Sequence, residues 1–263
     1  MCVGMDPPEH DPSADTPQQG RSDLRRLLRA FNLSLAGVLL LCGLFVLQGR
    51  IDLSGWMVQP WTLRGLAGLL GAPLLHGSIE HLLMNGIAIL MLGTLAGGVY
   101  PWATLRALPL LWLLSGLGAW LLGDSGSHHL GASGVTHGLA FLVFTLGLLR
   151  RDRAAIAAGM LAFLFYGGML LTILPREIDV SWQSHLGGAL GGVLAAVLFR
   201  RSDPMAPRQR YSWELEDEAL QPDDELERPA PDQVPVLWQR GPRDDALRDD
   251  SRGTVLPFRR PQD

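Results

Sequence analysis

The sequence contains no lysine, and all 22 of its basic residues are arginines. This absence excludes serine hydrolases that use a lysine as the general base. Cysteine is nearly absent as well. Cys2 lies at the N-terminus and Cys42 inside an apolar run, so neither a disulfide framework nor a cysteine metal site is indicated.

Acidic residues are rare in the middle of the chain. Between Phe31 and Leu149 only Asp52, Glu80 and Asp124 occur, whereas the last 63 residues hold 15 of the 26 acids. The mean hydropathy is only +0.17, but an apolar middle with polar ends is typical of a membrane protein. The net charge of −4 arises mainly in the C-terminal tail, so it says nothing about nucleic-acid binding. The expected partners include no nucleic acid.

Six apolar segments approach the ~20 residues that a helix needs to cross a bilayer. They predict an all-α, multi-pass membrane protein with a six-helix transmembrane bundle at residues 31–200. Residues 1–30 are expected to be a disordered, basic N-terminus, and 201–263 an acidic, proline-rich, disordered tail. The predicted spans are Phe31–Leu47, Ile79–Val99, Trp102–Leu122, Gly131–Leu149, Ala154–Leu174 and Trp182–Phe199.

The arginines predict the orientation of this bundle. If the N-terminus is cytoplasmic, ten arginines flank the spans on the inside and three lie in outside loops. This bias follows the positive-inside rule and places both termini in the cytoplasm. We expect a protein of the bacterial inner (cell) membrane.

Polar residues in the predicted spans cluster toward the outside. Ser133 lies in the sequence Gly-Ala-Ser-Gly at the start of the fourth span, where a helix N-terminus would favour a developing oxyanion. His185 lies near the outside start of the sixth span, at a similar depth, and could act as the base for Ser133. Glycines on both helices would allow close packing. A packed serine and a structurally hydrogen-bonded histidine are the simpler alternatives.

His81 and Asn85 are four residues apart on the second span and therefore share a helical face. Their side chains could stabilise an oxyanion, or make an ordinary hydrogen bond between helices. The nearby segment from His76 to His81 misses the HxxEH zinc motif by one residue. We expect no catalytic metal and no cofactor.

Three motifs together resemble the rhomboid family of intramembrane serine proteases. They are HGSIEHLLMN (76–85), GASG (131–134) and HLGGALGG (185–192), in the family's order within residues 31–200. The resemblance implies that Ser133 is the nucleophile and His185 the general base. It also implies an oxyanion hole formed by the Ser133 amide, His81 and Asn85.

By the same resemblance, Gly131 shapes the active-site loop and His76 has a structural or water-organising role. His137 stands where rhomboids often carry a tyrosine that stacks on the base. The expected substrates are transmembrane segments of membrane proteins in the lipid bilayer. Alternatives are rhombosortase-like processing of C-terminally anchored proteins, an inactive relative that binds membrane clients, or a histidine-lined metal or proton carrier.

Overall fold

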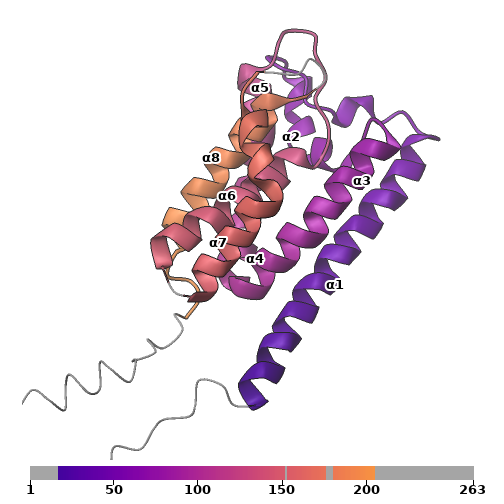
Figure 1. Cartoon of the computed structure of the whole chain (residues 1–263). Helices are drawn as coiled ribbons and strands as arrows, with labels where there is room; N and C mark the ends of the chain where they lie inside the picture. Colours follow the sequence, from indigo (N-terminus) through magenta and orange to yellow (C-terminus); the bar gives the residue numbers. More distant parts are fainter. Residues whose placement is uncertain (1–16, 152, 176–179, 205–263) are drawn as a thin grey trace, which may run out of the picture. The chain divides into compact units, whose positions relative to one another are not determined.

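The structure is a computed structural model that describes residues 17–151, 153–175 and 180–204, and every regular element in these ranges is helical (Figure 1). Most of the two predicted disordered ends therefore lies outside the described residues. The arginine-rich segment before the first predicted span belongs to a helix. The α-helices are α1 (Pro17–Gln48), α2 (Gly68–Gly71), α3 (Ile79–Ala88), α4 (Thr94–Val99), α5 (Pro101–Leu122), α6 (Ser133–Arg150), α7 (Arg153–Tyr166) and α8 (Trp182–Phe199).

Within the residues that the structure describes, five segments are long and apolar enough to cross a membrane by length and composition. They correspond to five of the six predicted spans, and one of them joins α3 to α4 through a π-helical turn at Ile89–Gly93. The candidate spans are Gly20–Gln48, Ile79–Val99, Pro101–Leu122, Ser133–Arg150 and Trp182–Phe199.

The remaining predicted span, at 154–174, is less regular. Helix α7 has only 14 residues and continues as a seven-residue 3-10 helix, Gly167–Ile173. Gly167 and Gly168 mark the change, and glycine disfavours an α-helix by about 1 kcal/mol relative to alanine. The sixth span is not confirmed and stays a prediction.

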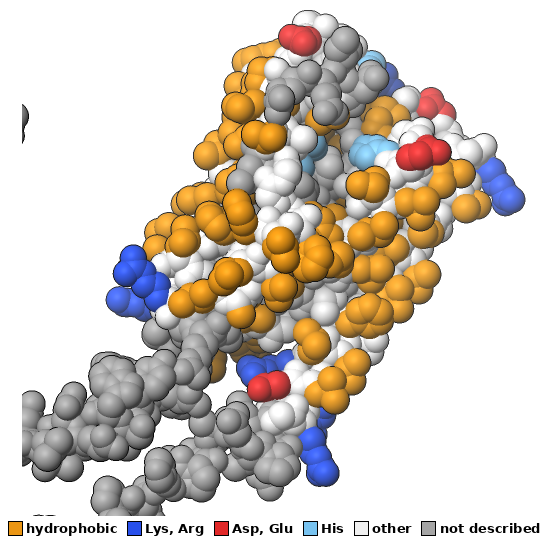
Figure 2. Space-filling view, viewed as in Figure 1, with side chains coloured by type: hydrophobic (Ala, Val, Ile, Leu, Met, Phe, Trp, Pro, Cys, Tyr) orange, Lys and Arg blue, Asp and Glu red, His pale blue; other side chains and the backbone are white. Residues whose placement is uncertain are grey.

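The surface follows the same division between apolar middle and polar ends. Figure 2 shows hydrophobic side chains along the middle of one face and charged side chains mainly toward its two ends. Leu83, Leu164 and Leu190, on three different helices, are all exposed. Such exposure is costly in water but not in lipid. These features identify an integral, multi-pass membrane protein.

Helix α8 packs along both α5 and α6. Glycines make this approach possible: a Cβ on Gly188 would lie 1.8 Å from the carbonyl oxygen of Gly134, and one on Gly187 would lie 2.2 Å from that of Leu114. A buried hydrogen bond of 2.8 Å joins the hydroxyls of Ser115 and Ser184 across the α5–α8 contact. The backbones of three helices are thus held close together around the start of α8.

The carboxylate of Asp203 links α8 to α5 at the end of α8 that lies away from His185. Asp203, just after α8, accepts hydrogen bonds of 2.9 Å from the backbone N–H groups of Trp102 and Ala103. These donors lie in the first turn of α5, where backbone N–H groups have no partner within the helix. A negative charge also interacts favourably with this end of the helix dipole. Arg150, the last residue of α6, donates to the carbonyl oxygens of Asp203 and Pro204.

Candidate active site

Ser133 is the first residue of α6 and lies directly after a strained loop. Gly131 in that loop has φ +114°, a conformation that other residues rarely adopt. Its N–H donates to the carbonyl oxygen of Ala72 at 2.8 Å, which fixes the loop to an earlier segment. Ser133 therefore presents its hydroxyl from a helix N-terminus, where the first N–H groups are free of helical partners.

His185 lies one turn into α8 and contacts Ser133 directly. Its Nε2 is 2.9 Å from the Ser133 Oγ, and its Nδ1 is 3.0 Å from the carbonyl oxygen of Thr172. A carbonyl can only accept, so Nδ1 carries the proton and donates to it. In the neutral imidazole, Nε2 is then the acceptor, and the Ser133 hydroxyl donates to it. This is the arrangement that a general base needs before it removes a proton from a nucleophile.

His137 stacks on His185, with ring centroids 3.8 Å apart and planes inclined by 14°. Its Nδ1 lies 2.7 Å from the carbonyl oxygen of Ser133, one turn earlier in α6. Its Nε2 lies 2.8 Å from the Thr172 hydroxyl. By the same reasoning Nδ1 donates to the carbonyl, so the Thr172 hydroxyl donates to Nε2. The ring of His137 thus stacks on His185 and also makes two hydrogen bonds of its own.

Thr172 is a site residue that sequence reasoning missed. Its carbonyl orients His185, and any residue could supply a carbonyl, so no side-chain pattern signals this contact. The hydroxyl does leave a signal: Thr172 is a lone threonine near the C-terminal end of the apolar segment 154–174. Polar groups at such positions usually have a partner or a function.

His81 and Asn85 lie in α3, His76 lies just before that helix, and His81 contacts the loop that precedes Ser133. His81 reaches Gly131, where a Cβ would be 2.5 Å from the imidazole Cε1. The rings of His76 and His81 pack edge to face, with their centroids 5.1 Å apart. The amide nitrogen of Asn85 is buried and makes no hydrogen bond to any described residue. A buried donor without a partner costs about 1–3 kcal/mol, so a ligand that accepts from it would recover that energy.

His76 is held in place through its main chain. Its N–H donates to the Gln48 side chain on α1, and its carbonyl accepts from the same amide. The imidazole is 1% exposed, and both ring nitrogens lack hydrogen-bond partners among the described residues. Burial, together with the nearby His81, lowers the pKa of His76 to about 4. The ring is therefore neutral at physiological pH.

His129 connects the loop before Ser133 to two other segments. Its ring nitrogens lie 2.9 Å from the Ser127 hydroxyl and 2.7 Å from the hydroxyl of Ser181, the residue preceding α8. Its backbone forms a reciprocal pair of hydrogen bonds with Val58 in the loop after α1. Burial lowers the pKa of His129 as well. This contact ties the loop before Ser133 to the start of α8, the helix that carries His185.

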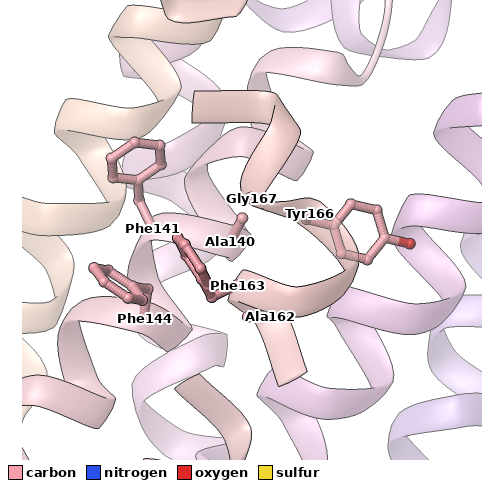
Figure 3. A pocket seen from close by; sticks show the side chains of 7 residues that line it. All are labelled: Ala140, Phe141, Phe144, Ala162, Phe163, Tyr166 and Gly167. Carbon is pink, nitrogen blue, oxygen red and sulfur yellow. The ribbon is translucent and has the colours of Figure 1, made fainter. Parts of the chain in front are cut away.

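A separate, partly open pocket lies between α6 and α7, and Figure 3 shows three phenylalanines among its lining side chains. The Tyr166 hydroxyl points away from them and lies 3.5 Å from the carbonyl oxygen of Ile87. This pocket contains none of the predicted site residues. Its lining residues are Ala140, Phe141, Phe144, Ala162, Phe163, Tyr166 and Gly167.

Comparison with known proteins agrees with the motifs. The family model described as the Rhomboid domain matches residues 61–202. Uncharacterized proteins of Mycobacterium bovis and Mycobacterium tuberculosis are 41% identical over 161 residues, which are 57% of this chain and 65% of each relative. One from Mycobacterium leprae is 38% identical over 145 residues, 51% of this chain and 56% of the relative. The chain thus spans less than two thirds of their length. No solved structure matches it.

Proposed function

The chain belongs to the rhomboid family, and from this premise we propose that it is an intramembrane serine endopeptidase. Ser133 is the nucleophile and His185 the general base in this proposal. The substrates are transmembrane segments of other membrane proteins, and the reaction needs no cofactor.

One observation carries the proposal. The Ser133 Oγ lies 2.9 Å from the Nε2 of His185, and the carbonyl of Thr172 fixes that imidazole in the tautomer that accepts the serine proton. A serine and a histidine that merely filled space would not require this orientation. The geometry suits acyl transfer, because nucleophile and base are already within hydrogen-bond reach.

The reaction begins when the Ser133 oxygen attacks the scissile carbonyl carbon and its proton moves to Nε2 of His185. The tetrahedral intermediate collapses as the C–N bond breaks and the imidazolium returns the proton to the leaving amine. A water molecule, deprotonated by the same nitrogen, then hydrolyses the acyl-enzyme and releases Ser133. The Thr172 carbonyl stabilises the imidazolium in both steps, since hydrogen bonds to an ionised group are stronger.

The oxyanion accepts hydrogen bonds from the Ser133 backbone N–H and from the side chains of Asn85 and His81. The unpartnered amide nitrogen of Asn85 supports this role, because a donor with no competing partner among the described residues is free to bind the developing charge. The contact of His81 with Gly131 brings the second side chain beside the nucleophile's loop.

We further propose six spans with both termini in the cytoplasm of a bacterial cell. The 14 residues of α7 rise about 21 Å and the seven that follow about 14 Å, enough together for a ~30 Å hydrocarbon core. Ser133 would then lie near the outer surface. A substrate helix must unwind there, because an intact helix hides its carbonyls in hydrogen bonds.

The test is cleavage of a single-span reporter by the full chain in lipid vesicles, together with labelling by a fluorophosphonate. The wild type should cleave and become labelled. Ser133→Ala and His185→Ala should lose at least ~1,000-fold in rate and lose the label, the scale seen when a member of a catalytic triad is removed. Ser125→Ala, in an exposed turn between α5 and α6, is the matched control and should behave as wild type.

The outcomes distinguish the alternatives. Unchanged cleavage by Ser133→Ala would overturn the serine mechanism. A folded wild type that neither cleaves nor becomes labelled would identify an inactive client-binding relative. Cleavage restricted to a reporter with a C-terminal anchor would identify rhombosortase-like processing.

A further inference from the structure

Thr172 contacts both His137 and His185 in the candidate site. The inference drawn from these contacts rests on the proposed protease function. Its carbonyl accepts from His185 and its hydroxyl donates to His137. We propose that Thr172 is a positioning residue that, together with His137, orients the base as a carboxylate does in a Ser-His-Asp triad. The predicted spans offer no well-placed acidic residue for that role.

The four hydrogen bonds form a closed ring. The Ser133 hydroxyl donates to His185, His185 to the Thr172 carbonyl, the Thr172 hydroxyl to His137, and His137 to the Ser133 carbonyl. With both imidazoles neutral, every bond has one possible direction, because the two carbonyls can only accept. The ring therefore fixes both imidazole tautomers and directs the Ser133 proton toward the base. Each imidazole links two of these bonds through its conjugated ring, so the bonds of each pair polarise one another and strengthen in a low-dielectric environment.

The hydroxyl matters because the carbonyl lies on a weakly structured segment. Thr172 belongs to the 3-10 helix Gly167–Ile173, whose hydrogen-bond geometry is poorer than that of an α-helix. His137, by contrast, lies in the second turn of α6 and is buried. A bond from the Thr172 side chain to His137 therefore anchors the Thr172 backbone to the helix that carries the nucleophile.

The test compares Thr172→Val, Thr172→Ser and His137→Phe in the full chain. Valine preserves the shape and the carbonyl but removes the hydroxyl, so kcat should fall about tenfold with little change in KM, as for one lost hydrogen bond. Serine restores the donor and should recover most of kcat. His137→Phe keeps an aromatic ring against His185 but cannot accept from Thr172, so it should also lower kcat.

A double-mutant cycle separates positioning from general damage. The double variant Thr172→Val/His137→Phe should be no slower than the slower single variant, because both remove the same bond. Thr104→Val is the matched control, since the Thr104 hydroxyl is buried without a partner among the described residues. Thermal unfolding of each variant reports on folding.

Wild-type kcat in Thr172→Val, failure of serine to restore it, or multiplicative losses in the double variant would overturn the positioning role. Persistent cleavage by Ser133→Ala would instead overturn the protease proposal, so the two failures are distinguishable.

Discussion

At the scale of single residues, a side chain at Gly131 is disfavoured for two reasons: the backbone conformation and the lack of space beside His81. Its φ of +114° strains any residue with a Cβ, and that Cβ would also lie 2.5 Å from the ring of His81. Gly126, in the exposed turn between α5 and α6, has φ +87°, but a Cβ there would meet nothing within 4 Å. A substitution at Gly126 therefore introduces backbone strain alone, whereas one at Gly131 introduces backbone strain and a steric clash with His81.

We predict that Gly131→Ala abolishes fluorophosphonate labelling, because it displaces either His81 or the loop that presents Ser133. Gly126→Ala should cost about 1–2 kcal/mol of stability through backbone strain alone and retain its labelling. Labelling rates and thermal unfolding of both variants check this. Equal labelling of the two alanine variants would show that the contact with His81 is unimportant.

The sequence identified many of the residues that meet in the candidate site, because their chemistry is carried by side chains. Ser133, His185 and His137 stand out as polar groups in apolar segments, and the structure brings all three into contact. The carbonyl of Thr172 could not be predicted in this way. It depends on where a 3-10 segment lies after folding, and no residue type records a backbone contact between distant segments.

At the scale of helices, the candidate site depends on the separation between α6 and α8. Ser133 and His185 lie on different helices, and the backbones meet at Gly188, where a Cβ would lie 1.8 Å from the Gly134 carbonyl oxygen. Even one methyl group there must push the helices apart. A displacement of about 1 Å is enough to cost a factor of ~100 in a positioned reaction.

We predict that Gly188→Ala lowers both the labelling rate and the unfolding temperature. The matched control is Gly37→Ala in α1, where a Cβ would meet nothing within 4 Å. Alanine favours a helix by up to ~1 kcal/mol over glycine, so this control should be neutral or slightly stabilising. A Gly188→Ala variant with wild-type labelling would mean that α8 can shift without moving His185.

Helix positions were largely predictable because apolar length and arginine flanks are local signals. Five predicted spans correspond to helical segments of sufficient length. The segment 154–174 is equally apolar, yet its α-helix ends at Tyr166. Two adjacent glycines follow, and hydropathy alone does not register their weak helix propensity. Thr172, which contacts both histidines of the site, lies in the 3-10 helix that follows.

At the scale of the whole molecule, contacts between distant segments support the site. Gln48 on α1 holds the backbone of His76, and Val58 pairs with His129. Both histidines have lowered pKa values because burial disfavours their charged forms. Acid should therefore lower the free energy of unfolding through the protonation of His76 and His129.

The sign follows from linkage between protonation and folding. In the unfolded chain a histidine has a pKa of about 6.5, whereas the folded pKa of His76 is about 4. Above pH 6.5 His76 is neutral in both states and its contribution to stability is fully present. Below that, the unfolded state binds the proton first, so the free energy of unfolding falls until the pH reaches about 4. Further acid brings no additional loss from this residue.

We predict that the unfolding temperature of the wild type falls between pH 6.5 and 4, and that His76→Phe makes this decline shallower. Phenylalanine keeps a ring in the buried site but cannot be protonated. The value at about pH 8 gives the effect of the substitution itself, so only the change with pH is compared. His129 still titrates in the variant, and part of the decline should therefore remain. An unchanged decline in His76→Phe would mean that the buried imidazole is not what couples folding to pH.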